Sequence, residues 1–215
     1  MITRAPLRSV PKPAVVRLSA IAALALGLTG CISLLPKSAP ASLYRFGVTP
    51  AAAEPARPNA VGVFRAMGQF QREAAGDQML TVTGERVAYI AESRWVAPAE
   101  VLFDEAVANA FEAAPGPVRL VSRGQAAHSD YALRLDVRNF EADYGGGGEA
   151  PTVTIRIRAV LTRDQSRTAV AEQLFEARAP ASENRVSAIV AAYDQALGQV
   201  LVQITAWANG AVGRG

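Results

Sequence analysis

The chain has 215 residues, of which 50% are hydrophobic and 19% charged, and its formal net charge is +3. Its single cysteine, Cys31, excludes a fold held together by internal disulfides. Four of the 22 Lys and Arg residues and none of the 19 Asp and Glu residues precede Cys31, so the rest of the chain carries 18 cations against 19 anions. This balance gives no support for a nucleic-acid partner, and the apolar content is sufficient for one hydrophobic core.

The first thirty residues have the composition of a secretory signal peptide. Four cations and no acidic residue precede residue 18, and a mostly apolar run follows from 18 to 29. This run has about a dozen residues, whereas a helix that crosses a bilayer needs about 20, so it is too short for a permanent span. We therefore predict that residues 1–30 are removed and do not belong to the fold.

The residues around Cys31 resemble the lipobox of bacterial lipoproteins. Leu28, Thr29 and Gly30 lead directly into Cys31. In lipobox proteins the peptide is cut before the cysteine, whose thiol carries a diacylglycerol, and the new amino terminus usually receives a further acyl chain such as palmitate. The resemblance implies cleavage between Gly30 and Cys31 and lipidation of Cys31, and an ordinary signal peptide with an incidental cysteine is the alternative. Ile32 stands where inner-membrane lipoproteins of Gram-negative bacteria usually carry aspartate, which implies the periplasmic face of the outer membrane.

Residues 31–58 have the composition of a tether. They are rich in Pro, Ala and Ser on both sides of the stretch LYRFGV, residues 43–48. Such a segment stays extended, so it would hold a domain away from the membrane surface. The alternation in residues 43–48 also allows a short strand that joins the sheet of the domain.

The globular domain is expected at residues 59–209, followed by a flexible tail at 210–215. Its first predicted strand is AVGVFRAM, residues 60–67. The stretch MLTVTGERVAYIAE, residues 79–92, predicts two short strands that are separated at Gly84.

A helix and a long hairpin are predicted next. Apolar residues recur every three or four positions from Pro98 to Ala113, which indicates an amphipathic helix. After a short strand at 118–122, apolar and charged residues alternate in DYALRLDVRNF, residues 130–140, and in TVTIRIRAVLT, residues 152–162. The four glycines at 145–148 are expected to form the hairpin tip.

A third antiparallel strand and a long helix complete the predicted domain. The strand is AVAEQLFEAR, residues 169–178, and the helix begins near Glu183, with Ser182 as its cap. Apolar residues form one stripe along this helix as far as Trp207, which most simply packs against the sheet, with a partner-binding face as the alternative. The predicted fold class is α+β, a single domain with a mixed, mainly antiparallel sheet and amphipathic helices packed on one face.

Signatures of enzymatic chemistry are scarce. The only histidine, His128, has Ser129 and Asp130 as immediate neighbours, whereas a nucleophile, a base and an orienting residue normally come from separated segments. A loop histidine is therefore the favoured interpretation. Asp136, Glu141 and Asp143 could be catalytic carboxylates, but arginines and acids that alternate on neighbouring strands are more simply cross-strand pairs on a solvated face. We predict no enzyme, no metal site and no cofactor.

One stretch is similar to a known family. ERVAYIAESRWVAPAEVLFDEAVANAFEA, from Glu85 to Ala113, resembles a segment of the ABC-type transport auxiliary lipoproteins, which are related to paraquat-inducible protein C. In that segment a strand ends in an aromatic residue, an Arg-Trp pair follows, and a proline starts a helix. Tyr89, Arg94, Trp95 and Pro98 match these positions. Trp95 is favoured as a core aromatic, with a partner contact as the alternative.

The resemblance implies an accessory subunit and no catalysis. Members of the family accompany transporters that have an inner-membrane ATPase and permease and a periplasmic substrate-binding protein of the mammalian-cell-entry (MCE) type, and that move lipids between the two membranes. The expected partners are such an MCE-type protein and, through the acyl chains, the membrane, and self-association stays open. The alternative is a lipid carrier, which would need an apolar cavity on the order of several hundred Å³, whereas a docking subunit needs an exposed patch.

Overall fold

The computed structural model describes residues 40–47, 60–121, 124, 128–145, 149–163, 166 and 168–213. The chain from Ala41 onward forms one unit. The predicted signal peptide, Gly30, Cys31 and most of the tether lie outside the described residues, as do residues 146–148 of the expected hairpin tip.

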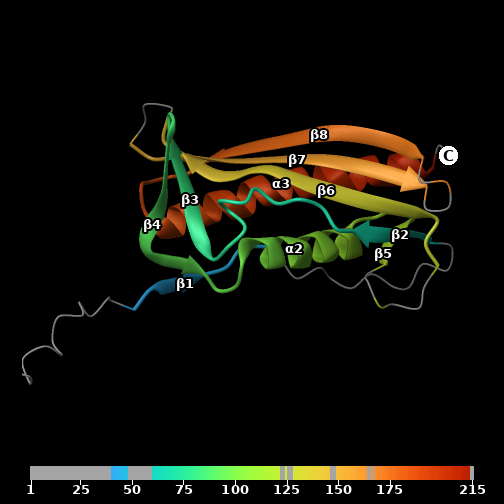
Figure 1. Cartoon of the computed structure of the whole chain (residues 1–215), viewed down its shortest axis with the longest axis horizontal. Coiled ribbons are helices and arrows are strands. Elements are labelled where there is room, and N and C mark those ends of the chain that lie inside the picture. Colours follow the sequence, from blue (N-terminus) through green and yellow to red (C-terminus); the bar gives the residue numbers. More distant parts are fainter. Residues whose placement is uncertain are drawn as a thin grey trace, which may run out of the picture. The chain divides into compact units, whose positions relative to one another are not determined.

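The predicted strands and helices are all present (Figure 1). In chain order they are β1 (Ser42–Tyr44), β2 (Val61–Ala66), β3 (Gln78–Thr83), β4 (Arg86–Trp95), α2 (Ala99–Ala113), β5 (Val118–Val121), β6 (Tyr131–Asp143), β7 (Thr152–Arg163), β8 (Ala169–Pro180) and α3 (Val186–Val212). The break at Gly84 is confirmed, because β3 and β4 meet in a tight turn where Gly84 has φ 59°, a conformation that glycine adopts without steric cost. Within the described ranges, no helix has the length and hydrophobicity of a membrane span.

The sheet is organised around β6. β7 pairs antiparallel with nearly the whole of one edge of β6, and β8 continues the sheet beyond β7. The other edge of β6 is shared, because β2 pairs parallel with its first residues and β3 with its last two. β5 lies beyond β2, and β4 and then β1 lie beyond β3. Parallel and antiparallel pairs therefore coexist, the antiparallel ladders are the longest, and the predicted mixed α+β fold is confirmed.

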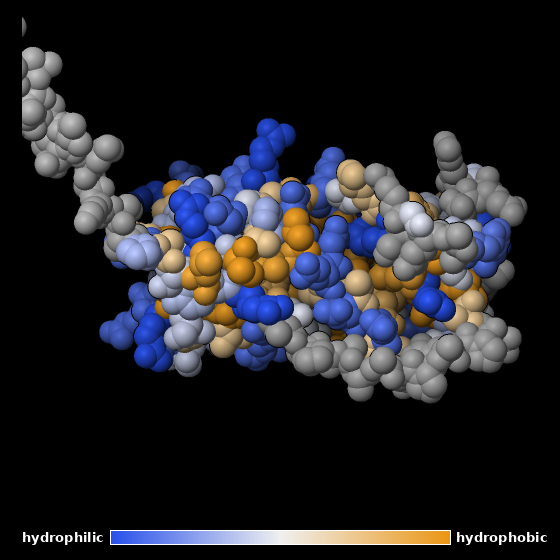
Figure 2. Space-filling model, turned by 90° about the horizontal axis from the view of Figure 1, so that it is seen from below, coloured by the Kyte–Doolittle hydropathy of each residue, from blue (hydrophilic) through white to orange (hydrophobic). Residues whose placement is uncertain are grey.

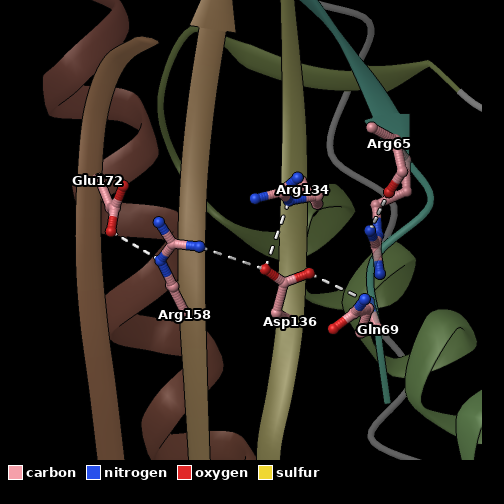
Figure 3. Close-up of polar contacts among 7 residues, drawn as sticks. Arg65, Gln69, Arg134, Asp136, Arg158 and Glu172 are labelled. Carbon is pink, nitrogen blue, oxygen red and sulfur yellow. Dashed lines mark hydrogen bonds and ion pairs between the residues drawn. The ribbon is translucent and has the colours of Figure 1, made fainter.

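Both helices lie on one face of the sheet (Figures 1 and 3). α3 packs against β7 and β8, and α2 contacts β5 and α3. Six residues of the predicted stripe of α3 are at most 5% exposed, namely Ile189, Tyr193, Leu197, Val200, Leu201 and Ile204. Full burial of one such apolar side chain contributes about 1.5–3 kcal/mol. The stripe therefore forms part of the hydrophobic core, as favoured from the sequence.

Aromatic rings fill one end of this core. The ring of Trp95 lies edge-on to Phe46 and to Tyr193, with centroids 4.8 and 5.2 Å apart. Phe140 contacts Tyr193 at 4.9 Å, and the Tyr193 hydroxyl donates a hydrogen bond of 3.3 Å to the carbonyl of Leu80. Phe70 and Phe103 extend the cluster. Burial raises the pKa of Tyr193, and this hydrogen bond satisfies its buried hydroxyl. The interior at this end is tightly packed.

The short strand expected within residues 43–48 is present as β1, so the structured domain includes residues before 59. β1 pairs parallel with the end of β4, with Ser42 opposite Ser93, and Phe46 is 2% exposed. Gly47 follows with φ 72°, and a Cβ there would lie 2.6 Å from the Cβ of Ala106. Residues 42–47 therefore belong to the domain, because their side chains and backbone contribute to its sheet and core.

α3 differs from the expectation at both ends. It begins at Val186, and no side chain caps its first turn, so Ser182 is not the cap. The helix continues to Val212, and Ala211 is only 2% exposed. Residues 210–212 of the expected tail are therefore helical, because the apolar stripe extends through the last turn of the helix.

Candidate functional site

β4 carries three of the four residues that matched the family segment. Tyr89 is 42% exposed, and its hydroxyl donates a hydrogen bond of 3.1 Å to the carbonyl of Glu73. The Arg94 guanidinium lies 3.0 Å from both carboxylate oxygens of Asp77. Trp95 is 2% exposed, and its backbone N–H donates a hydrogen bond to the Asp77 carbonyl at 2.7 Å. Tyr89 and Arg94 are thus at the surface, Trp95 is in the core, and all three hold the loop that precedes β3.

This loop in turn caps α2. No side chain caps the first turn of α2. Instead, the N–H of Ala99 donates to the carbonyl of Gly76 at 2.9 Å, and the N–H of Glu100 donates to the carbonyl of Ala75 at 3.3 Å. These two bonds satisfy N–H groups that a helix otherwise leaves without partners. The Arg-Trp segment therefore fixes where α2 begins.

A bulge in β4 precedes this segment. Gln78 is opposite Arg94 and Leu80 is opposite Tyr89, so β4 uses more residues than β3 between the two pairs. Glu92, within the bulge, has φ 53°, a conformation that costs a non-glycine residue about 1–3 kcal/mol. Bulges redirect the side chains that follow them. No pattern in the sequence indicates this bulge, because glutamate is not a residue that favours positive φ.

An open pocket of about 510 Å³ lies between the segment Arg65–Phe70 and the first half of α2. We call it the α2 trough. Two exposed apolar residues line it, Met67 at 76% and Val101 at 44%, together with the carboxylates of Glu100 and Asp104. Figure 2 views the molecule from below, the side on which α2 lies in Figure 1, and shows uncovered apolar residues among polar ones on this face. The sequence analysis did not identify this trough.

Arg65 forms part of the trough wall, with its side chain 15% exposed. Its guanidinium lies 2.7 Å from the Asp104 carboxylate and also donates to the carbonyl of Ala66. Nε is buried and has no hydrogen-bond partner in the described part of the chain. Burial lowers the pKa of Arg65, whereas the charges of Asp104 and Asp136 oppose that effect. Arg65 thus links β2 to α2 at an energetic cost that its partners offset in part.

The wall of the trough that is formed by Arg65–Phe70 runs against β6. The N–H of Val137 donates to the carbonyl of Gln69 at 2.7 Å, and the N–H of Phe140 donates to the Gln71 side chain at 2.7 Å. A Cβ on Gly68 would lie 1.8 Å from the carbonyl oxygen of Leu135, so only glycine allows this approach. These contacts hold the wall in place along the stretch of β6 between β2 and β3.

Asp136 joins this wall to the outer face of the sheet (Figure 3). Its carboxylate accepts a hydrogen bond of 3.1 Å from the N–H of Gln69 and lies 3.4 Å from Arg134 and 3.8 Å from Arg158. Arg158 also pairs with Glu172 at 2.7 Å, and this hydrogen bond lowers the pKa of Glu172. Cross-strand pairing is thus confirmed for Asp136, which is 3% exposed and does not lie on a solvated surface, because the segment around Gln69 covers it. Glu141 instead accepts hydrogen bonds from Gln71 and Asn139.

Residues with catalytic or metal-binding chemistry do not gather at this site. His128, the only histidine of the chain, is exposed and lies 3.2 Å from Asp130. Among the residues that the structure describes, no group of three His, Cys, Asp or Glu side chains could hold a metal ion. The side chains that line the trough provide apolar contacts and charged groups.

Arg65 and Asp104 should respond unequally to substitution. Asp104→Asn leaves a buried guanidinium without its ion pair and should lower the free energy of unfolding by about 1–2 kcal/mol. Arg65→Met removes the buried charge and keeps the packing, so its loss should stay within about 1 kcal/mol. Urea unfolding followed by circular dichroism measures both, and a larger loss for Arg65→Met would contradict this account.

The core is filled by side chains, the Arg-Trp segment holds the loop that caps α2, and the trough is open to solvent. The comparison with protein families gives the class of the protein. The chain belongs to the ABC-type transport auxiliary lipoprotein component family, whose model matches residues 73–205. The match covers the loop before β3, the Arg-Trp segment and most of α3, and it confirms the resemblance found in the sequence.

Solved structures share the fold. The crystal structure of protein XCC0632 from Xanthomonas campestris, a DUF330 protein, has 25% sequence identity and a TM-score of 0.68, covering 80% of this chain and 98% of its own. An uncharacterized protein has 14% identity and a TM-score of 0.58, covering 78% of this chain and 97% of its own. Among curated proteins, none matches the sequence.

Proposed function

We propose that this chain is a lipoprotein of the outer membrane, facing the periplasm, that serves as the docking subunit of an MCE-type ABC lipid transport system. Membership of the transport auxiliary lipoprotein family supports this role. The lipobox-like residues up to Cys31 support an acyl anchor after cleavage between Gly30 and Cys31, and Ile32 supports the outer membrane. The MCE-type protein is the partner that the family resemblance implies.

The observation that favours docking over lipid carriage is how the interior is filled. Aromatic rings occupy one end of the core, where Trp95, Phe140 and Tyr193 are each at most 2% exposed. The α2 trough has a volume within the range of ligand sites, but it is open to solvent and lined by charged side chains. A carrier would instead shield acyl chains in an apolar cavity. The geometry therefore supports docking of a protein partner over lipid carriage.

A tether between the acyl anchor and the domain would favour docking. Residues 31–58 contain five prolines, so the proposed linker favours extended backbone. An anchored domain searches only the space that its linker reaches, which raises its effective concentration near a transporter component. Anchoring and docking therefore support one another.

Capture and lipid analysis together test the proposed function. The acylated full chain, cross-linked in membranes, is expected to capture the MCE-type protein of the same bacterium. A secreted form with residues 1–31 replaced by an ordinary cleavable signal peptide is expected to retain far less than one phospholipid per protein after detergent-free purification, measured by lipid extraction and mass spectrometry. One lipid per protein without a captured partner would overturn docking and support the carrier.

A further inference from the structure

We propose that the α2 trough docks a polypeptide segment that combines a basic side chain with an apolar one. The proposal rests on the proposed docking function and names the surface and the chemistry of the partner. Apart from the Arg65–Asp104 pair, the trough is lined by one further charged side chain, the carboxylate of Glu100. A Lys or Arg of the partner would pair with this carboxylate.

The charge of α2 favours a cationic partner. The helix carries Glu100, Asp104, Glu105 and Glu112 and has no Lys or Arg. In the described part of the chain, Asp104 is the one of these four with an ion-pair partner. An acid in the first turn, such as Glu100, also stabilises the helix through its dipole, but that effect does not account for carboxylates further along α2. A surface of this sign speeds the approach of a basic partner.

Apolar exposure at the same place favours a contact that excludes water. Met67 is the most exposed large hydrophobic residue described, at 76%, and Val101 interrupts the polar face of α2 at 44%. Both line the trough, whose inner residues Phe103, Leu135 and Val137 belong to the core. Methionine adapts its shape to different apolar partners. An apolar side chain of the partner would therefore contact Met67 and Val101 beside the Glu100 carboxylate.

The trough is held in shape before any partner arrives. Its β6 side is fixed by the bonds of Gln69 to Val137 and Asp136, and its helix side by the carbonyls that cap α2. Rigid walls reduce the ordering cost of binding. The carboxylates of α2 would be repelled by an anionic membrane surface, so a protein segment is the favoured occupant.

Binding to the purified periplasmic part of the MCE-type protein tests this surface. The acylated full chain in nanodiscs is titrated, and the Kd is measured at low and high salt. Glu100→Lys and Met67→Asp should each weaken binding about tenfold or more, because one reverses the pairing charge and the other places a charge in the apolar contact. Raising the salt concentration should weaken binding of the unsubstituted chain.

Two matched variants control for charge and for surface hydrophobicity. Glu112→Lys makes the same charge change at the far end of α2, and Val202→Asp puts aspartate on an exposed apolar position of α3. Both should change the Kd less than about twofold. Thermal unfolding by circular dichroism verifies that all four variants fold.

The outcomes separate this inference from the proposed function. If the unsubstituted chain binds and Glu100→Lys and Met67→Asp leave the Kd unchanged, docking stands and the trough is not its site. Equal weakening of binding by Glu112→Lys and Glu100→Lys would mean that the overall charge of α2, and not the trough, determines the affinity. Absence of any binding, together with failed capture in cells, overturns both proposals. Loss of binding of the secreted form to anionic phospholipid vesicles in Met67→Asp, with binding to the MCE-type protein retained, would assign the trough to a membrane surface.

Discussion

Replacement of Leu201 by aspartate is expected to lower the free energy of unfolding by about 3–5 kcal/mol, because it places an unpaired carboxylate in the core and removes a packed side chain. Leu201 is 5% exposed and faces the sheet from α3. A domain of this size has about 5–15 kcal/mol of stability, so the variant should be largely unfolded at moderate urea concentrations. The unfolding midpoint in urea, followed by circular dichroism, measures the loss.

Val202→Asp is the matched control for this substitution. Val202 is the next residue of the same helix and is 69% exposed. Both variants put aspartate into the interior of α3, so the unfavourable helix propensity of aspartate is common to them. Val202→Asp should therefore stay within about 0.5–1 kcal/mol of the unsubstituted chain. Similar midpoints for the two variants would mean that the stripe of α3 is not buried.

The sequence predicts the strands and helices well because each one carries its own periodicity. Apolar and charged residues alternate from Leu133 to Arg138 in β6, and apolar residues occupy every second position from Val153 to Leu161 in β7, which predicts the buried face of each strand. α3 repeats its apolar residues at helical spacing over most of its length, and this repeat predicts a buried stripe. Such patterns depend on near neighbours in the chain, so they can be found without knowledge of the fold.

The pairing of distant strands could not be predicted in this way. β2 and β3 both pair with the same edge of β6, and β1 pairs parallel with β4. No local pattern encodes these partners, because they depend on how the segments between them fold. The burial of Asp136 has the same cause. Its place in the alternation is that of Arg134 and Arg138, and only the segment around Gln69 makes its environment different.

The candidate site was only partly accessible from the sequence. The Arg-Trp segment was found by its resemblance, but its role in capping α2 depends on contacts with the loop at Ala75 and Gly76. The α2 trough was missed because its walls are at least thirty residues apart in the chain. One local signal was available, since Val101 lies among the polar residues on the outer side of α2.

Replacement of Cys31 by serine is expected to abolish attachment to the outer membrane. In the proposed mature form, two or three acyl chains on Cys31 hold the domain at the bilayer, and each buried methylene contributes about 0.8 kcal/mol. Serine has no thiol to accept the diacylglycerol, so the chain should remain an unprocessed precursor or be released as a differently cleaved soluble form. Density-gradient separation of the two membranes, followed by immunoblotting, measures the loss.

Intact mass spectrometry decides between an acyl anchor and an incidental cysteine. The native chain should begin at Cys31 and carry the added mass of its acyl chains, whereas Ser33→Ala, which leaves Leu28, Thr29, Gly30 and Cys31 unchanged, should be processed like the native chain. A native protein with a free Cys31 thiol, or a Cys31→Ser variant that still fractionates with the outer membrane, would refute the lipid anchor and with it the advantage that tethering gives to docking.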